Sequence, residues 1–535
     1  MAASREEEER PGGRLLPGAA AALWTSLAAL FTVRLAGMAP DDFFVTYRYA
    51  WNLAGGNGFV FNPGERVFGL TDPGLGLLLA ALHLVTRLPI PWLGTAVTGA
   101  ALVGIALVLL LDGRERGRTP EALVGGTLIV GSSFLWVNQG GGVFFALLFL
   151  LIAARLRSPV RAGLLAGLAV WMRPDAALGV GLLGLLLGIE KRRLPWTYLL
   201  AAGGVASAGV LAAWSWFGSP LPNTLAAKHA MTVGMTEVGS GFRGFWPRAF
   251  RLMSRHWGPW WTLMTGVGLA GHAAMLLGGG GRGSAGPAQA TGSEGGWEGA
   301  SAHEGAEQGR TEPRGGGRAT RLLALVSLAM ALAYPLLEVP FFSWYAVPTA
   351  VGVLYGVPYL TGALGRGLAA RLGRRQMVGA AAATAILAPL LLSFVPATWR
   401  WHTQYQWQRH LRTYREAALW IRDHSAPQDA LAYVEIGVMS FYSERPLVDL
   451  LGLVTPGAIP YVEADDLVGA FLAHPTRFVI HHSRGRMSPL IQRRWFPRAY
   501  EAVAYFHEGD GRGLTIYQRR PGSKLPRPRP PRERR

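Results

Sequence analysis

The stretch Met38-Ala-Pro-Asp-Asp-Phe-Phe-Val-Thr-Tyr-Arg-Tyr-Ala-Trp-Asn-Leu-Ala54 directly follows the first long apolar segment of the chain. Its adjacent carboxylates, Asp41 and Asp42, repel each other and lose hydration beside an apolar layer, so such a pair usually serves chemistry or holds a cation. A solvated turn after a helix is the simpler explanation of the pair alone. The rest of the chain favours the first interpretation, because it places further polar groups at the same face.

The composition indicates a membrane protein. Half of the residues are apolar and only 16% are charged, yet the formal net charge is +19. Soluble domains rarely combine these properties, whereas a polytopic membrane protein with arginine-rich loops does. The absence of cysteine excludes disulfides and thiolate metal sites. The abundance of Ala, Gly, Arg and Pro is typical of a GC-rich bacterial genome, so we expect a multi-pass protein of the bacterial plasma membrane.

We predict an α-helical polytopic protein with about eleven membrane spans. The first lacks the basic start and the cleavage site of a signal peptide, so we expect it to be retained. Several segments are shorter than the roughly 20 residues that a full span needs, which predicts broken or part-depth helices. The short apolar segment Leu75–Val85 is expected to lie on the outer face or dip into it. The spans are Leu16–Met38, Trp92–Leu111, Glu121–Val137, Val143–Ala154, Leu164–Trp171, Ala176–Ile189, Trp196–Phe217, Pro259–Leu277, Leu322–Leu337, Trp344–Ala363 and Val378–Val395.

The distribution of basic residues orients these spans. With a cytoplasmic N-terminus (residues 1–15), the cytoplasmic loops are 112–120, 155–161, 190–195, 278–321 and 364–377. They hold about 18 Lys and Arg, against about 9 in the outer loops before residue 400, as the positive-inside rule requires. The membrane domain then covers residues 16–398, with a first outer loop at 39–91.

Three segments outside the spans differ in character. Residues 278–320 are rich in Gly, Ser, Glu and Ala and are predicted to be a disordered cytoplasmic linker. Residues 399–520 predict a soluble α/β domain on the outer face, with a helix over Gln404–His424. Residues 521–535 are a basic disordered tail, which either attracts anionic lipid or surface polymer or only aids solubility. The predicted strands are Ala430–Val434, Pro446–Leu450, Arg477–Ile480, Ala502–Phe506 and Gly513–Tyr517.

Polar groups interrupt the apolar segments at the outer face, which describes a cavity that opens outward. The interruptions are Asp41-Asp42, residues 138–142, residues 171–175, residues 219–229 and residues 338–348. This set suits the transfer of a sugar from a lipid-linked phosphate. A carboxylate can take the proton of an acceptor hydroxyl, and cations can stabilise the phosphate that leaves. The candidate cations are Arg48, Arg173 and Lys228.

Each candidate also has a structural explanation. Arg173 and Asp175 can pair only to stabilise a helix break, and Lys228 and His229 can be interfacial residues whose heads reach water. Trp344 and Tyr345 can line the lipid or stack on a sugar, or they can anchor the protein at the membrane interface.

Metal binding has one candidate site. Asp41 and Asp42 can share a divalent cation, Mg²⁺ or Mn²⁺, that bridges to phosphate. His481 and His482 lack a third ligand, so no metal is predicted there.

The stretch Asp41 to Pro73, with its Asp-Asp pair, Tyr47-Arg-Tyr-Ala50 and Asn62-Pro-Gly-Glu65, resembles the first outer loop of bacterial GT-C-fold glycosyltransferases. The resemblance is to the branch that includes mycobacterial terminal arabinofuranosyltransferases, and it covers most of the chain in matching order. Later motifs that look like this family's are Arg173-Pro-Asp175, Pro222-Asn-Thr-Leu-Ala-Ala-Lys228, Trp344-Tyr345, Glu435-Ile-Gly437, Tyr442, Arg445-Pro446 and Asp449 to Pro456.

The resemblance implies a multi-spanning enzyme that uses a polyprenyl-phosphate sugar, with Asp41 or Asp42 as catalytic base. Phosphate handling would fall on Lys228 and Arg173. The motifs add Asn223, Glu435 and Asp449 as candidate substrate-binding residues.

The chain departs from the family pattern at two places. Gly140-Gly-Gly-Val143 stands where relatives often have Gly-Leu-Glu-Thr, and the sequence offers no nearby Glu as a replacement. Phe68-Gly-Leu-Thr71 replaces the usual Glu-Gly-Tyr-Thr. The Asp-Asp pair is then the site's only evident set of carboxylates.

We therefore expect a membrane glycosyltransferase that moves a sugar, of which arabinofuranose is one candidate. The donor would be a polyprenyl-phosphate sugar, and the acceptor an envelope glycan, lipid or protein at the outer face. Membrane lipids are further expected partners, and a nucleic acid is not. The alternative is a non-catalytic protein of the same fold that binds or transports lipid-linked sugars. A transporter should show internal repeats, and the sequence shows none.

Overall fold

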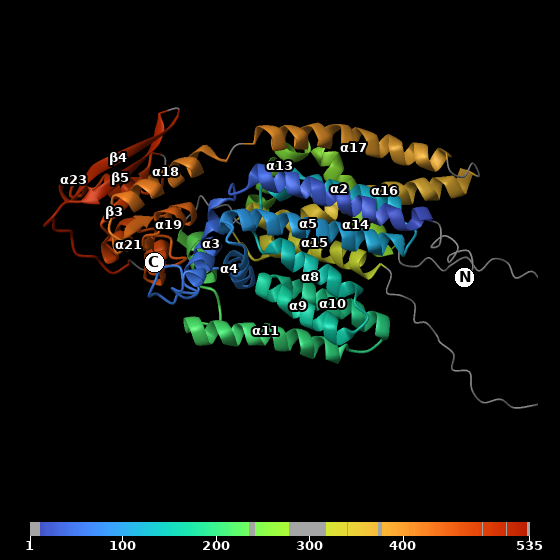
Figure 1. The fold of residues 1–535 in the computed structure, drawn as a ribbon, viewed down its shortest axis with the longest axis horizontal. Coiled ribbons are helices and arrows are strands. Elements are labelled where there is room, and N and C mark those ends of the chain that lie inside the picture. The colour runs from blue at the N-terminus through green and yellow to red at the C-terminus, as the bar shows by residue number, and fades with distance from the viewer. Residues whose placement is uncertain are drawn as a thin grey trace, which may run out of the picture.

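The protein is an elongated bundle of helices with a small α/β domain at one end (Figure 1). The structure, a computed structural model, describes residues 11–234, 241–277, 317–339, 341–372, 377–405, 407–483, 485–509 and 511–531. Most of the predicted linker, 278–316, and most of the predicted cytoplasmic N-terminus, 1–10, lie outside the described residues, as do residues 532–535 of the tail.

The bundle contains every segment that was predicted to span the membrane, and each of these segments is helical. The predicted segment Glu121–Val137 is broken into α6 and α7 at Ser132, whose backbone is extended. The bundle helices are α2 (Pro11–Leu35), α5 (Ile90–Arg114), α6 (Thr119–Gly131), α7 (Ser133–Trp136), α8 (Val143–Arg155), α9 (Pro159–Met172), α10 (Ala176–Lys191), α11 (Trp196–Phe217), α14 (Trp261–Leu277), α15 (Arg318–Leu336), α16 (Val347–Leu372) and α17 (Met377–Gln404).

Five helices in the described ranges are long and apolar enough to cross a membrane, so the count of eleven spans stays a prediction. The five are Pro17–Leu35, Ile90–Arg114, Trp196–Phe217, Arg318–Leu336 and Ser343–Arg371. Three helices extend past the predicted limits of the membrane domain and the linker. Helix α2 begins at Pro11, before the predicted start at residue 16. Helix α15 begins at Arg318, inside the predicted linker 278–320, and α17 continues to Gln404, past the predicted end at residue 398.

Two short helices lie at the junction of the bundle and the α/β domain (Figure 1). They are α3 (Asp41–Ala54) and α4 (Pro73–Thr86). The acidic pair occupies the first turn of α3, where the helix dipole favours negative charge. Aromatic side chains of α3 are buried on both sides of it, so this helix is a wall between the two parts of the molecule.

Two helices after α11 were not predicted. They are α12 (Asn223–Gly234) and α13 (Gly241–Trp257). In α13, Phe245, Ala249, Met253 and Trp257 are buried at four-residue spacing, with arginines between them. This is the pattern of an amphipathic helix, and it was present in the sequence.

The α/β domain is built on a five-stranded sheet, and all five predicted strands are present. The strand order is β2-β1-β3-β5-β4. β1 pairs in parallel with β2 and β3, while β5 pairs antiparallel with β3 and β4, with Ile480 of β3 opposite Ile516 of β5. The strands are β1 (Leu431–Tyr433), β2 (Leu447–Asp449), β3 (Phe478–His482), β4 (Tyr500–Gly509) and β5 (Arg512–Arg519). The helices are α18 (Arg409–Asp423), α19 (Gly437–Ser443), η2 (Pro456–Ala458), α20 (Ile459–Glu463), α21 (Leu467–Ala473), α22 (Ser488–Ile491) and α23 (Phe496–Ala499).

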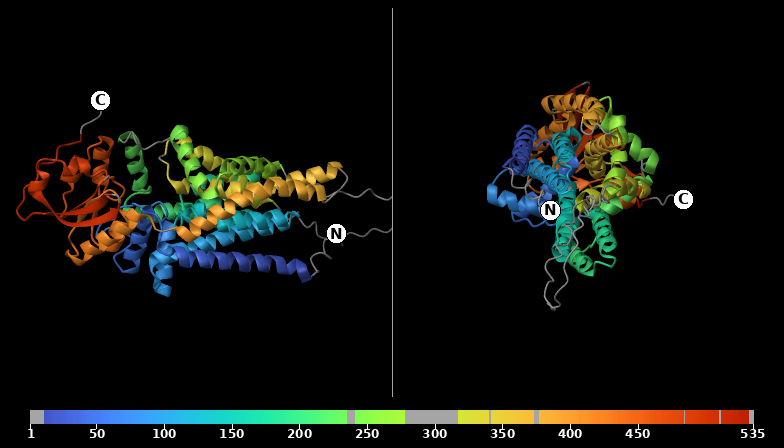
Figure 2. Two further views of the ribbon diagram at one scale, coloured as in Figure 1. Left: turned by 90° about the horizontal axis from the view of Figure 1, so that it is seen from above. Right: turned by 90° about the vertical axis from the view of Figure 1, so that its right-hand side faces the viewer.

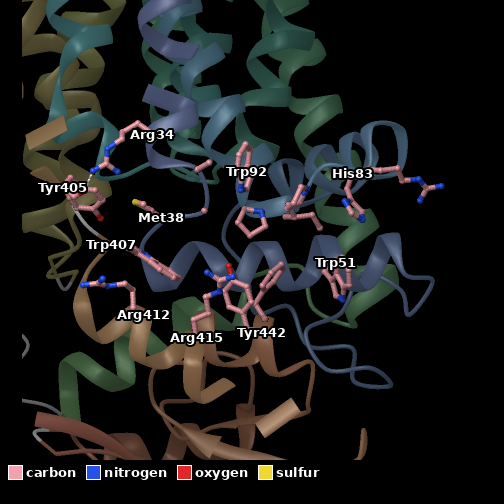
Figure 3. Close-up of a pocket in the computed structure, with 17 residues that line it drawn as sticks. Arg34, Met38, Trp51, His83, Trp92, Tyr405, Trp407, Arg412, Arg415 and Tyr442 are labelled. Atoms are coloured by element: carbon pink, nitrogen blue, oxygen red, sulfur yellow. Dashed lines mark hydrogen bonds between the residues drawn. The ribbon is translucent and has the colours of Figure 1, made fainter. Parts of the chain in front are cut away.

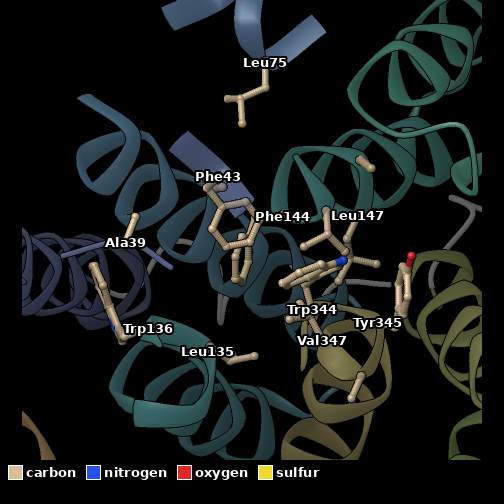
Figure 4. Packing of buried hydrophobic residues seen from close by; sticks show 14 of the residues in the cluster. Ala39, Phe43, Leu75, Leu135, Trp136, Phe144, Leu147, Trp344, Tyr345 and Val347 are labelled. Carbon is tan, nitrogen blue, oxygen red and sulfur yellow. The ribbon is translucent and has the colours of Figure 1, made fainter. Parts of the chain in front are cut away.

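A continuous apolar core joins α3 to the bundle. The ring of Trp344, on the short helix η1 (Ser343–Ala346), stacks on Phe342 at 4.7 Å and lies 5.3 Å from Phe43. Trp344 and Tyr345 are both buried in this core (Figure 4). They are therefore interior residues, and the interpretation of them as interfacial anchors is wrong.

Candidate active site

Asp41 fastens α3 to the α/β domain. Its Oδ2 accepts a hydrogen bond from the backbone N–H of Gly437 at 2.9 Å, and its Oδ1 accepts one from Val438 at 2.7 Å. These two N–H groups belong to the first turn of α19, where they have no partner within the helix. The carboxylate that the sequence singled out is thus an anchor, with both of its oxygens engaged by protein.

Asp42 and Glu435 are exposed carboxylates beside this anchor. Desolvation by the surrounding protein, followed by the charge of Asp42, raises the pKa of Asp41 to about 7. Desolvation, followed by the charges of Asp41 and Asp42, raises the pKa of Glu435 to about 8. Desolvation also raises the pKa of Asp42, against the opposing effect of Lys228. Three carboxylates therefore share one site, so the expectation that the Asp pair stands alone is wrong.

Lys228 is the cation whose charge opposes the desolvation that raises the pKa of Asp42. It extends from α12, and its Nζ donates a hydrogen bond to the Tyr345 hydroxyl at 3.0 Å. The ammonium also lies over the rings of Phe342, at 5.0 Å, and Tyr345, at 5.5 Å. Two aromatic rings and one hydroxyl hold the ammonium group in place. Of its three N–H donors, one bonds to Tyr345, and the other two have no acceptor in the part of the chain that the structure describes.

Arg173 and Asp175 form the pair that the sequence suggested. The Arg173 Nη2 lies 2.7 Å from the Asp175 Oδ2, and the Arg173 Nε donates to both carboxylate oxygens. The Tyr334 hydroxyl donates to the same carboxylate, and the Tyr334 ring stacks on Tyr345 at 4.1 Å. Tyr345 therefore links the pair to Lys228, and the pair helps to form the site as well as the break between α9 and α10.

Asp72 is a further carboxylate of the site that sequence reasoning missed. It is buried, and it accepts hydrogen bonds from the Thr46 hydroxyl at 2.5 Å and from the Gly142 N–H at 3.2 Å. Burial raises its pKa, and the charge of Arg173 is among the opposing effects. Gly142 occupies the position where relatives often have a Glu, and its N–H group bonds to Asp72. Asp72 therefore supplies a carboxylate next to the position where the motif lacks one. The sequence did offer a signal for this residue, because Asp72 stands directly before Pro73, where an apolar helix begins.

Four predicted substrate-binding residues take other places. The Arg48 side chain is buried and donates to the Phe61 carbonyl, and Asn223 donates to the carbonyls of Gly452 and Leu453. Asp449 is fully buried and accepts backbone N–H groups of the turn that follows β2. Arg48, Asn223 and Asp449 thus bond to backbone groups, and substrate contact by these three residues stays a prediction. His229 is exposed on α12.

Metal binding by Asp41 and Asp42 stays a prediction. Within the described ranges, no group of three or more His, Asp or Glu side chains has an arrangement that could hold a metal ion.

The fold matches solved membrane enzymes over nearly the whole chain. ArnT from Cupriavidus metallidurans bound to undecaprenyl phosphate aligns with a TM-score of 0.54 at 12% identity, covering 92% of this chain and 97% of that chain. The oligosaccharyltransferase AglB from Archaeoglobus fulgidus, in complex with an inhibitory peptide and a dolichol-phosphate, aligns with a TM-score of 0.51 at 12% identity. That alignment covers 88% of this chain and 70% of that one. The chain thus shares the fold of these enzymes, and the five long apolar helices in its described part support a multi-pass membrane protein.

The sequence comparisons cover smaller parts of the chain. The terminal β-(1→2)-arabinofuranosyltransferase of Mycobacterium tuberculosis is 31% identical over 218 residues, which span 36% of this chain and 35% of that protein. The family model described as a domain of unknown function, DUF8728, matches residues 397–520. This match covers nearly the same residues as the predicted outer domain.

Proposed function

We propose that the protein transfers a sugar from a polyprenyl-phosphate donor to an envelope glycan, lipid or protein acceptor at the outer face of the bacterial plasma membrane. The observation that carries the proposal is the exposed carboxylate Asp42, which lies within electrostatic reach of Lys228. A proton acceptor and a cation side by side are what such a transfer requires.

Asp42 is the better candidate for the base of the two adjacent carboxylates. Both oxygens of Asp41 already accept backbone N–H groups, whereas Asp42 is exposed. In the transfer, Asp42 takes the proton of the acceptor hydroxyl while the oxygen bonds to the anomeric carbon of the sugar. The bond from that carbon to the phosphate oxygen breaks, and the phosphate leaves with the electron pair. Desolvation raises the pKa of Asp42, against the opposing charge of Lys228, which suits a base that works closer to neutral pH.

Lys228 is the candidate that neutralises the leaving phosphate. Its ammonium keeps donors for phosphate oxygens beyond the one that Tyr345 accepts. Arg173 is less available, because its guanidinium is largely occupied by Asp175. We assign it to positioning Tyr345, over whose ring it lies at 5.6 Å.

The proposed topology has a cytoplasmic N-terminus and an extracytoplasmic α/β domain. The start of α2 and the α/β domain lie at opposite ends of the bundle (Figure 2), which supports this arrangement. For the donor sugar, the similarity to an arabinofuranosyltransferase supports arabinofuranose, so the enzyme would be a pentosyltransferase.

The test is sugar transfer in vesicles that contain the purified protein and a polyprenyl-phosphate sugar, with the product separated from the lipid donor. We expect Asp42→Asn to abolish transfer and Lys228→Gln to slow it strongly, both at an unchanged protein level. The matched control is Asp423→Asn, an exposed carboxylate of α18. Full activity of Asp42→Asn would overturn the base assignment.

The glycan and lipid profile of a deletion strain would name the donor and acceptor, since the missing terminal sugar identifies both. A protein that binds the donor without any transfer would instead support the non-catalytic alternative.

A further inference from the structure

A cavity lined by arginines and aromatic side chains lies beside α3 (Figure 3). Its volume is about 640 Å³. The ends of α2 and α4, the start of α5, and α18 and α19 form its walls. Four arginines line it: Arg34, Arg87, Arg412 and Arg415. Its aromatic lining residues are Trp51, Trp92, Tyr405, Trp407, Phe441 and Tyr442.

The position of α3 separates this cavity from the Lys228 group. Phe43 packs against Trp344 on the Lys228 side, at 5.3 Å between ring centroids. Phe44, the next residue, packs against Trp407 at 5.9 Å and Tyr442 at 5.7 Å, which both line the cavity. Successive residues of a helix point about 100° apart, so α3 presents a different face to each site.

The cavity has the charge and the shape for an anionic ligand. Among the described residues that line it there is no Asp or Glu. The Arg415 guanidinium lies 5.0 Å from the centre of the Tyr442 ring, and the Arg34 Nη2 donates to the Tyr405 carbonyl at 2.6 Å. Both arginines are thus held in position at the wall. Planar guanidinium groups match the oxygens of a phosphate in geometry and charge.

An exposed apolar rim beside the cavity indicates a lipid as the source of that phosphate. On α2, Leu30 is 58% exposed and Val33 is 69% exposed, and Arg34 follows directly. In the last turn of α4, Val85 is 83% exposed, close to the exposed Arg87 that follows the helix. A soluble anion needs only the arginines, whereas a phospholipid also covers the apolar side chains with its acyl chains.

We infer that this cavity binds the phosphate headgroup of an anionic membrane phospholipid, with the acyl chains along α2 and α4. The site is distinct from the proposed donor site and does not depend on sugar transfer. A test of lipid binding can therefore succeed even if the protein transfers no sugar, and sugar transfer can be found even if this cavity binds no lipid.

The test counts the phospholipids that stay bound to the full-length purified protein by native mass spectrometry. The protein is exchanged into mixed micelles of phosphatidylglycerol and phosphatidylcholine. We expect the wild type to retain phosphatidylglycerol and the double variant Arg412→Gln/Arg415→Gln to bind it at least about tenfold more weakly, because two charge-assisted contacts are lost. The matched control is Arg494→Gln/Arg498→Gln, two exposed arginines of the same domain that do not line the cavity.

Each other outcome overturns the inference. Equal retention of phosphatidylcholine would show that the headgroup charge is not recognised, and an equal loss in the control would show unspecific attraction. Displacement of the lipid by inorganic phosphate at the same concentration would mean that the ligand is a soluble anion. If the double variant unfolds, Arg87→Gln on the exposed turn takes its place, and unchanged retention there contradicts the inference.

Discussion

The contact between α3 and α19 should tolerate no side chain at Gly437. A Cβ atom added there would lie 1.8 Å from the Asp41 carbonyl oxygen and 3.1 Å from its Cγ. The two helices would have to separate by roughly 1.5 Å to restore van der Waals contact. The hydrogen bonds from Gly437 and Val438 to the carboxylate, at 2.9 and 2.7 Å, would then break.

The expected cost of Gly437→Ala follows from those two bonds. A hydrogen bond to a charged group contributes about 1.5–3 kcal/mol, so losing both costs about 3–6 kcal/mol, and local relaxation reduces this to about 2–4 kcal/mol. The assay is thermal unfolding of the detergent-solubilised protein at a pH above the pKa of Asp41, together with sugar transfer. We expect a lower unfolding midpoint and a large loss of transfer, because Asp41 no longer holds the first turn of α19.

The control for this variant is Gly203→Ala in α11, where an added Cβ meets nothing within 4 Å. Alanine is favoured over glycine in a helix by about 1 kcal/mol, so the control should keep or raise the unfolding midpoint. If Gly437→Ala unfolds at the wild-type midpoint with full activity, then α19 does not rest on Asp41 and the reasoning is refuted.

Four further outcomes are expected. The carboxyl groups of Asp41 and Glu435 have raised pKa values, so the folded state binds their protons more tightly than the unfolded chain does. The stability that they contribute is present below about pH 4 and is lost as the pH rises through about 7 to 8, and unfolding midpoints of Glu435→Gln across pH should show a flatter dependence. Sugar transfer should rise with pH as Asp42, whose pKa is raised by desolvation, loses its proton, and a flat pH–rate profile would contradict this. Asp449→Asn should destabilise the α/β domain by about 1–3 kcal/mol, because it removes a buried acceptor of backbone N–H groups, which proteolysis of that domain would detect. Gly142→Ala should cost about 1–3 kcal/mol through overpacking, since its Cβ would lie 2.3 Å from the Met172 carbonyl oxygen, and an unchanged unfolding midpoint would show that the contact relaxes freely.

Local patterns predicted most of the elements of the fold. The strands around Ala432, Val448 and Val479 were correct because alternation and apolar runs report burial on a sheet directly. The helix α13 was missed although its buried residues recur every four positions. The break between α6 and α7 was expected from the shortness of the segment, but its position at Ser132 was not.

The roles of individual charged residues were harder to predict. Asp449 and Arg48 belong to motifs of the resemblance, and both are buried against backbone groups. A motif indicates that a residue type is needed at a position, but it does not say whether the side chain contacts substrate or supports the backbone. That distinction depends on burial and on the partners available in space.

The sequence by itself determined the apolar segments, the strands of the α/β domain and the acidic pair at the start of α3, because each of these depends on residues close together in the chain. Only the tertiary structure decided which charges meet. Asp41 and Gly437 are 396 positions apart, yet a hydrogen bond joins them. Packing of α3 between the bundle and the α/β domain brings Asp42, Glu435 and Lys228 to one side and the arginine-lined cavity to the other. No local periodicity encodes such contacts, since they arise when distant segments bury their apolar faces together.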